Sequence, residues 1–341
     1  VATAAFKVLI HFFPADTTLP EKYADSLASI PDGPDKLAGI AIGEQAAADI
    51  IALRTGDGLL AASTYTVPPP GPGVWEPTKL PDGTIVPPVD PWMADLKPFL
   101  RETPEQYRPA PPPALDDPAY LADLAEVRDI GGAMSATRTL EQTQVAQFWT
   151  TNMVVQTNAS YRQLSATRGL TLLDTARLMA AGNMLATDSL IATFDSKYTY
   201  NFWRPFTAIQ HTNPDGSYSV DPLNTWMPAV MTPSFPEYVA GHGSFISAQA
   251  ELYARFFGTT QIEVDLESAV TGTVRHFSTV DDLRTEIINA RTWGGLHYRT
   301  SSELAVALGQ KLAGDGLSMF FGLDPASDTA QHNIISGGIR K

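Results

Sequence analysis

Three short clusters in the second half of the chain place the strongest constraint on its fold. They are residues 197–205 (KYTYNFWRP), 233–243 (PSFPEYVAGHG) and 291–297 (RTWGGLH). Together they hold one lysine, two arginines and two histidines. If the fold brings them to one pocket, three permanent cations and two imidazoles can hold a tetrahedral oxyanion. The sequence therefore predicts a fold in which these clusters converge.

The charge of the chain makes this clustering more informative. The net charge is −14, so a pocket for an anion must gather its cations locally, and Lys197, Arg204 and Arg291 are the candidates. The same charge argues against a nucleic-acid or anionic-membrane partner, since either needs a basic face. No apolar run approaches the roughly 20 residues of a transmembrane helix. The chain has no cysteine, which excludes disulfides, thiolate metal sites and a catalytic thiol.

Helical patterns dominate the chain, whose hydrophobic share of 44% indicates a sizeable core. Apolar positions recur at helical spacing over residues 38–54 and stop at a Gly-Asp-Gly segment. We expect further helices over 118–130, 139–151, 170–194, 243–257 and 302–321, with Asp116 or Asp117 capping the first of these. Alternating β patterns are nearly absent. The sequence predicts a single all-α domain over residues 1–341.

A Pro-rich segment interrupts this pattern, because sixteen of the 27 prolines fall between Pro68 and Pro118. Such a segment cannot be regular helix or central strand. It is either a linker between domains or an ordered loop on the surface. Four aromatic residues favour an ordered loop over residues 66–116, since they are poorly suited to a solvated linker: Trp75, Trp92, Phe99 and Tyr107.

Within the first cluster, Lys197 and Arg204 are seven residues apart, so on a helix they would project from nearly the same face. Pro205 would end that helix and place Arg204 near its C-terminal edge. A solvated stripe of two cations is the alternative. The aromatic residues between them, which include Tyr198 and Trp203, argue for burial instead.

The second cluster precedes an apolar helix. Gly241 lets the backbone approach a ligand, and the start of the helix offers free N–H groups and the positive end of the dipole. His242 can donate to a bound oxygen or exchange protons with it. The alternative is a capping loop with a satisfied histidine.

In the third cluster, Arg291 and His297 flank Gly294 and Gly295. The double glycine breaks a helix and can turn the chain so that both side chains reach one point. The remaining histidines lack such neighbours, and we do not expect them in the site: His11, His211, His276 and His332.

Taken together, the clusters resemble the signature shared by the vanadium-dependent haloperoxidases and the type 2 phosphatidic acid phosphatase superfamily. That signature is Lys, six residues, Arg-Pro; then Pro-Ser-Gly-His; then Ser-Arg, five residues, His. The resemblance covers roughly residues 190–310, and residues 43–58 resemble bacterial members of the haloperoxidase group. It implies an all-α helical bundle of the haloperoxidase and acid phosphatase type, with the Pro-rich loop on its surface.

The resemblance also implies roles for individual residues. His297 would be the vanadium ligand, or the nucleophile of a phosphatase, and His242 the acid/base. The other cofactor-binding positions are Lys197, Arg204, Ala240, Gly241 and Arg291. Phe235 and Trp203 would be available to line a halide pocket. Such a cradle suits vanadate or phosphate, because bidentate guanidinium groups match the geometry of an oxyanion.

Four positions depart from the signature. Ala240 replaces the serine beside Gly-His, Val239 the proline before it, Ala290 the serine before the arginine, and Ser301 the carboxylate four residues after the second histidine. The missing hydroxyl at residue 240 would weaken anion binding by about 1 kcal/mol. A histidine ligand needs a polar partner for its other nitrogen, and three carboxylates could serve: Glu303, Asp195 or Glu237.

The function expected from this resemblance is that of a vanadium-dependent haloperoxidase, which oxidises halide with hydrogen peroxide in the presence of a small organic acceptor. One alternative is an acid phosphatase that forms a phosphohistidine at His297. Another is a catalytically weakened homologue that binds phosphate or vanadate. We expect no nucleic-acid or membrane partner, and a homo-oligomer is compatible with the sequence. The start at Val1 is compatible with a removed leader, so we expect a secreted or periplasmic bacterial protein.

Overall fold

The computed structural model describes residues 1–79, 82–100, 103–213, 217–219 and 221–325. The chain divides into two compact units, Val1–Leu59 and Leu60–Lys341. The first unit holds three helices, α1 (Ala2–Phe12), α2 (Thr18–Ala28) and α3 (Pro34–Arg54). The end of α3 agrees with the helix expected from the sequence. The sequence predicted one domain over residues 1–341, and this remains a prediction.

The second unit begins with the Pro-rich segment, which has only two short 3-10 helices, η1 (Pro91–Asp95) and η2 (Pro104–Tyr107). Its described residues nevertheless pack closely on the long helix α7 (Leu172–Tyr200). The Asp188 carboxylate on α7 accepts hydrogen bonds from the amides of Phe99 and Leu100, both at 2.7 Å. The Trp75 side chain is fully buried. These contacts supply partners that an irregular backbone lacks on its own.

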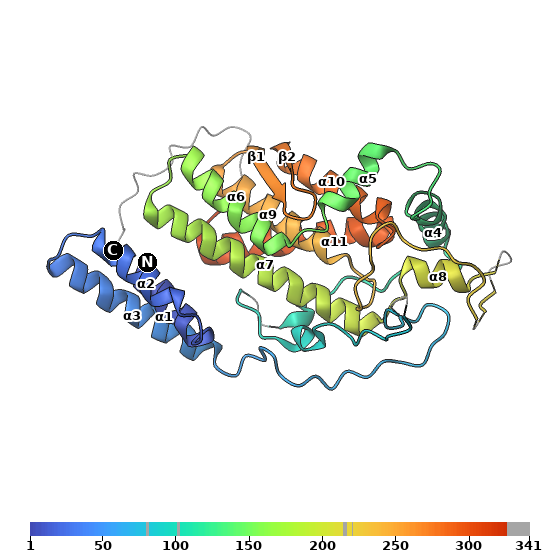
Figure 1. Ribbon diagram of the computed structural model, residues 1–341, viewed down its shortest axis with the longest axis horizontal. Helices are drawn as coiled ribbons and strands as arrows, with labels where there is room; N and C mark the ends of the chain where they lie inside the picture. The colour runs from blue at the N-terminus through green and yellow to red at the C-terminus, as the bar shows by residue number, and fades with distance from the viewer. Residues whose placement is uncertain (80–81, 101–102, 214–216, 220, 326–341) are drawn as a thin grey trace. The chain divides into compact units, whose positions relative to one another are not determined.

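The rest of the second unit is mainly helical, which confirms the all-α fold class (Figure 1). Besides α7, its helices are α4 (Pro118–Ile130), α5 (Leu140–Phe148), α6 (Met153–Thr167), α8 (Pro205–His211), α9 (Gly241–Phe257), α10 (Val280–Trp293) and α11 (Arg299–Phe321). Asp117 caps α4 by accepting a hydrogen bond from the Ala119 amide at 2.8 Å. Across the described residues, none of the helices is long and apolar enough to cross a membrane.

One antiparallel hairpin interrupts the helices, with strands β1 (Gln261–Ser268) and β2 (Thr273–Thr279). Along β1, Ile262, Val264 and Leu266 are buried while the residues between them face outward. This alternation is the period of a strand with one buried face, and the expectations from the sequence left this strand out. The hairpin packs on α6 and leaves the helical fold class unchanged.

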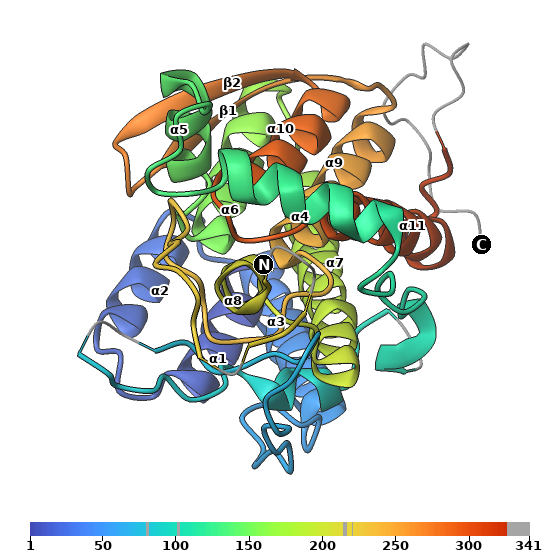
Figure 2. The same cartoon turned by 90° about the vertical axis from the view of Figure 1, so that its right-hand side faces the viewer.

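Helix α9 lies at the centre of this unit, in contact with α7, α10 and α11 (Figure 2). Its packing on α11 is close enough to require glycine at one position. A Cβ at Gly309 would lie 2.0 Å from the carbonyl oxygen of Ser244 on α9. This arrangement holds the first turn of α9 beside the end of α7 and the turn between α10 and α11.

The structure corrects the expected placement of Lys197 and Arg204 on one helix. Helix α7 ends at Tyr200, and Asn201 adopts a left-handed conformation with φ 50°. Arg204 then stands at the N-cap of α8, so that Pro205 begins a helix rather than ending one. Proline is well suited to a first helical position, since its missing N–H has no helical partner there. The two cations therefore meet across the break between two helices rather than along one helical face.

Candidate functional site

Lys197 lies in the last turn of α7 with its ammonium group fully buried. The Nζ atom donates to the carbonyl oxygens of Pro236 at 2.9 Å and Glu237 at 2.8 Å. It also lies 4.9 Å from the centre of the Phe235 ring. The second sequence cluster thus folds directly over the first.

Arg204 joins the first cluster to the other two. Its Nε donates to the Phe235 carbonyl oxygen at 3.0 Å, and its Nη1 donates to the Leu296 carbonyl oxygen at 2.9 Å. The same Nη1 lies 3.1 Å from Nε2 of His297. The Arg204 guanidinium group also lies 4.9 Å from the centre of the Phe235 ring. The clusters predicted to converge therefore do meet around Phe235.

The His297 ring is buried, and both of its nitrogens have partners. Its Nδ1 lies 2.8 Å from Oε1 of Glu237, which also accepts the Tyr298 amide at 3.1 Å. A carboxylate accepts a hydrogen bond from Nδ1–H, and a guanidinium can only donate a hydrogen bond to Nε2. These partners select the tautomer with hydrogen on Nδ1 and a lone pair on Nε2. His297 is thus prepared to bond an electrophilic atom through Nε2.

Glu237 is the one of the three suggested carboxylates that reaches His297. Asp195 instead accepts from Nε of Arg108 at 2.7 Å, and Glu303 acts electrostatically on Arg299. Burial raises the pKa of Glu237, and Ser301, which stands where the signature has a carboxylate, is among the groups that oppose this rise. The missing acidic residue at position 301 is therefore replaced from another part of the chain.

Arg291 and His242 complete the group of charged and titratable side chains. The Arg291 Nη1 donates to the Trp149 carbonyl oxygen at 3.3 Å, while its Nε is buried without a partner. His242 stands in the first turn of α9 and is half-buried. Within the described part of the chain, its ring makes no hydrogen bond. Its pKa is nevertheless lowered by burial and then by Arg291, Lys197 and Arg204, which places it near all three cations.

The first turn of α9 also carries Ala240 and Gly241. Ala240 is the N-cap and is fully buried, with no side-chain cap bond to the helix. The peptide bond between Tyr238 and Val239, just before it, is cis. Amide groups at the start of a helix lack carbonyl partners within it, so the Gly241 amide is available to an anion.

Of the two aromatic residues expected at a halide pocket, only Phe235 contacts the cations. The Trp203 ring is buried against Tyr218, with their ring centres 6.5 Å apart. Trp203 follows the end of α7 at Tyr200, and its backbone amide donates to the Gly73 carbonyl oxygen. The placement of Trp203 at a halide pocket stays a prediction. His332 lies outside the described residues.

The groups that hold the cations in place were missed by the sequence analysis. They are the backbone carbonyls of Trp149, Phe235, Pro236, Glu237 and Leu296. The amide of Tyr298, which holds the Glu237 carboxylate, was missed as well. Every residue has a backbone carbonyl group, and every residue except proline has a backbone N–H. Their use in a site therefore leaves no signal in the sequence.

The cluster concentrates positive charge in a buried place, and the pKa values of its members shift accordingly. Burial lowers the pKa of Lys197 well below its ordinary value, with Arg204 adding to the effect. Burial likewise lowers the pKa of Arg204 to about 10 and that of Arg291 to about 9. In His297, burial and the same cations lower the pKa well below its usual range. Burial raises the pKa of Glu237 to about 7, against the opposing influence of Lys197 and Arg204.

An oxyanion such as vanadate or phosphate fits these residues. Three cations and one carboxylate leave a surplus of two positive charges when all four groups are ionised. Two guanidinium nitrogens, Nη2 of Arg204 and Nε of Arg291, are buried without hydrogen-bond partners. Buried donors of this kind are costly unless a ligand accepts from them. No group of three or more histidine, aspartate or glutamate residues in the described part of the chain could hold a metal cation.

Comparison with known proteins agrees with this architecture. Residues 177–321 match the VCPO second helical-bundle domain. A bacterial vanadium-dependent iodoperoxidase has a similar structure, with a TM-score of 0.75 and 24% identity over 96% of this chain and 81% of that chain. The holo form of a bacterial vanadium-dependent chloroperoxidase gives a TM-score of 0.70 and 18% identity over 92% of this chain and 79% of that chain. The apo form of a bacterial vanadium-dependent chloroperoxidase gives a TM-score of 0.67 and 18% identity over 93% of this chain and 82% of that chain. No curated protein matches the chain.

Proposed function

We propose that this chain, which contains a VCPO second helical-bundle domain and has the fold of the vanadium haloperoxidases, is a vanadium-dependent haloperoxidase. The observation that carries the proposal is the state of His297. Its Nε2 lone pair points into a group of buried cations while Glu237 holds Nδ1. Its substrates would be hydrogen peroxide, a halide and a small organic acceptor. A secreted or periplasmic location and a homo-oligomeric state remain proposals alongside it.

The residues divide the work of such a site. His297 would bond vanadium through Nε2, and Lys197, Arg204 and Arg291 would neutralise the oxyanion oxygens. The Gly241 amide would add a donor at the positive end of α9. Vanadate, when bound, supplies a Lewis-acidic centre that activates hydrogen peroxide toward a halide.

His242 is the group suited to proton transfer. The three cations and burial lower its pKa, so the imidazole is neutral near pH 7 and can accept a proton from an incoming peroxide. Phe235 shields Lys197 and Arg204 from water on one side, which strengthens their attraction for the anion. Glu237 keeps the His297 lone pair on Nε2 by holding the proton on Nδ1.

The direct test is halide oxidation by protein loaded with orthovanadate. Peroxide-dependent bromination or iodination of a phenol dye should appear, and His297→Ala should abolish it. His276→Ala is the matched control, because His276 is an exposed histidine that pairs with Asp265 and Glu263. The proposal is wrong if protein with verified vanadium content halogenates the dye with none of the halides.

The same experiment separates the two alternatives, because a lone pair on Nε2 also suits a nucleophile. Hydrolysis of a nitrophenyl phosphate that His297→Ala removes, without halogenation in vanadate, would identify a phosphatase that acts through a phosphohistidine. Tight vanadate or phosphate binding with neither activity would identify a weakened binding homologue.

A further inference from the structure

The distribution of exposed methionines is unusual in a chain that has no cysteine. Four of the eight methionines are strongly exposed: Met134 at 95%, Met231 at 80%, Met319 at 71% and Met227 at 55%. Without thiols, these thioethers are the side chains that react most readily with a two-electron oxidant. Their positions therefore decide where such an oxidant would be consumed.

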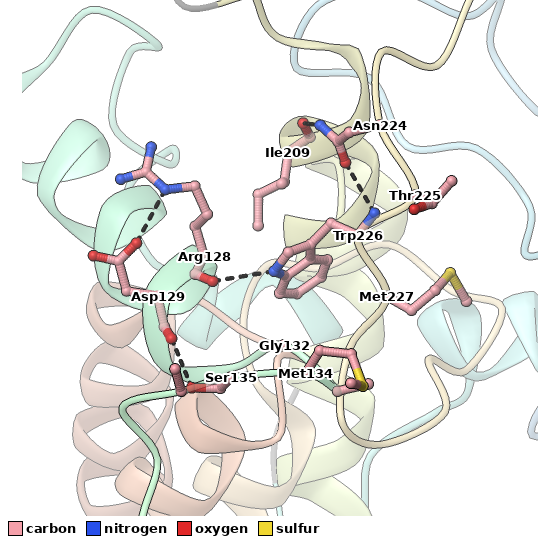
Figure 3. Close-up of a pocket in the computed structure, with 12 residues that line it drawn as sticks. Arg128, Asp129, Gly132, Met134, Ser135, Ile209, Asn224, Thr225, Trp226 and Met227 are labelled. Carbon is pink, nitrogen blue, oxygen red and sulfur yellow. Dashed lines mark hydrogen bonds and ion pairs between the residues drawn. The ribbon is translucent and has the colours of Figure 1, made fainter.

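Three of these methionines lie on two segments that pair beside the candidate site. The Ala133 amide donates to the Met227 carbonyl oxygen at 2.8 Å, and the Ala229 amide donates to the Gly131 carbonyl oxygen at 2.9 Å. Figure 3 shows Met134 and Met227 on the wall of one pocket, together with the Trp226 indole. Met231 follows four residues after Met227 on the same segment.

The paired segments are attached to the turn that links Arg291 to His297. The Val230 amide donates to the Gly294 carbonyl oxygen at 3.1 Å. Gly295 has φ +77°, and a Cβ there would lie 2.4 Å from the Gly131 carbonyl oxygen and 2.9 Å from Pro228. The methionine-bearing segments thus contact the backbone of the candidate site directly.

Met319 is different. It stands twenty residues after Arg299 on α11, which at the rise of an α-helix corresponds to about 30 Å. Its exposure lies within the range of the other three, so it offers a matched reference within the same molecule.

We propose that Met134, Met227 and Met231 form an oxidant trap beside the candidate site, which consumes hypohalous acid released there. The inference rests on the proposed haloperoxidase function. The sulfur lone pair bonds the halogen and the halogen–oxygen bond breaks, releasing hydroxide. Water then bonds sulfur, halide leaves and two protons are lost. Each thioether gains one oxygen, and the halogen is reduced by two electrons to halide.

The group that this trap protects is the Trp226 indole. Its Nε1 donates to the Arg128 carbonyl oxygen at 3.1 Å, and the ring packs on Gly132. Oxidation of the indole would break the link between this segment and α4. Methionine sulfoxide formation is reversible, whereas loss of the indole contact would loosen the segment that supports Gly294.

The test compares oxidant made by the protein with oxidant added from outside. Vanadate-loaded protein is supplied with peroxide and bromide without an organic acceptor, and sulfoxide at each methionine is quantified by peptide mass spectrometry. A second sample receives reagent hypobromous acid, and a third receives peroxide without bromide. We expect oxidation at the three trap methionines relative to Met319 to be several-fold higher during turnover than with the added reagent. Equal ratios in these two samples would overturn the trap.

Dye bromination is measured in parallel, so the two proposals can fail separately. Bromination with equal ratios rejects only the trap, while absence of both bromination and bromide-dependent sulfoxide rejects the proposed function as well. In the variant with Met134→Leu, Met227→Leu and Met231→Leu, we expect several-fold more Trp226 oxidation per turnover. Met319→Leu should leave Trp226 oxidation unchanged. Unchanged Trp226 oxidation in the triple variant would also overturn the trap.

Discussion

Restoring a hydroxyl at residue 240 offers a quantitative test of the candidate site. Ala240 is fully buried, stands at the N-cap of α9, and makes no side-chain bond to the helix. In Ala240→Ser, the new hydroxyl could donate to a bound oxyanion or accept an amide at the start of α9. These two outcomes affect different measurements, so they can be told apart.

The magnitudes follow from the number of bonds gained. One hydrogen bond is worth about 1 kcal/mol, rising to about 3 kcal/mol with a charged acceptor, which corresponds to roughly 5- to 150-fold in Kd. A helix cap would instead add about 0.5–2 kcal/mol to the stability of the protein without ligand. When the anion is bound, we expect the new hydroxyl to donate to it rather than to cap the helix, because a charged acceptor makes the stronger hydrogen bond.

The assay is calorimetric titration with orthovanadate, and separately with phosphate, alongside the melting temperature of the free protein. Ala250→Ser is the control, since Ala250 is equally buried on the same helix but ten residues farther from the N-cap. It should leave the affinity for either anion unchanged. If Ala240→Ser folds with an unchanged or higher melting temperature but binds neither anion more tightly, residue 240 does not face the ligand and our assignment of the cradle is wrong.

Three further predictions concern a carboxylate, a cation and a glycine. The folded protein raises the pKa of Glu237 from 4.5 to about 7, so its contribution to stability is fully present below pH 4.5 and is lost as the pH rises through about 7. The loss amounts to about 3 kcal/mol of unfolding free energy. In Glu237→Gln the side chain does not titrate, so the melting temperature should not fall in this way between pH 4.5 and pH 7. A pH profile parallel to that of the wild type would contradict us. Arg204→Lys should weaken vanadate binding about 10-fold or more by titration, because one lysine ammonium cannot bond the Phe235 and Leu296 carbonyl oxygens and still offer the oxyanion a free donor such as Nη2. Full affinity would exclude the role we give Arg204. Gly295→Ala should lower unfolding stability in urea by about 2–4 kcal/mol, since φ is +77° and the Cβ would contact backbone; wild-type stability would show that the turn can relax.

The sequence predicted that the charged residues of three clusters would gather, but not the backbone path between them. A spacing of seven residues fits two turns of one helix, and it also fits a break between two helices. Asn201 was the available signal for the break, because asparagine tolerates the left-handed conformation in which α7 ends. The contacts that Asn201 makes with Tyr65 and Trp75 come from distant parts of the chain, so the spacing alone could not reveal them.

The partner of His297 shows a different limit of the sequence. Three carboxylates were candidates, and their positions in the chain did not distinguish them. Asp195 is engaged by Arg108, which comes from the Pro-rich segment, and only Glu237 reaches the imidazole. Contacts between distant segments of this kind follow from the tertiary arrangement, whereas helix caps such as Asp117 follow from local chemistry and were predictable.

Glu237 has one further consequence for how the site responds to disturbance. Its carbonyl oxygen holds the ammonium group at the end of α7, and its carboxylate holds the imidazole before α11. A single residue therefore contacts groups at the ends of two helices that are far apart in the chain. A shift of the loop that carries Glu237 would act on the cation and the imidazole together.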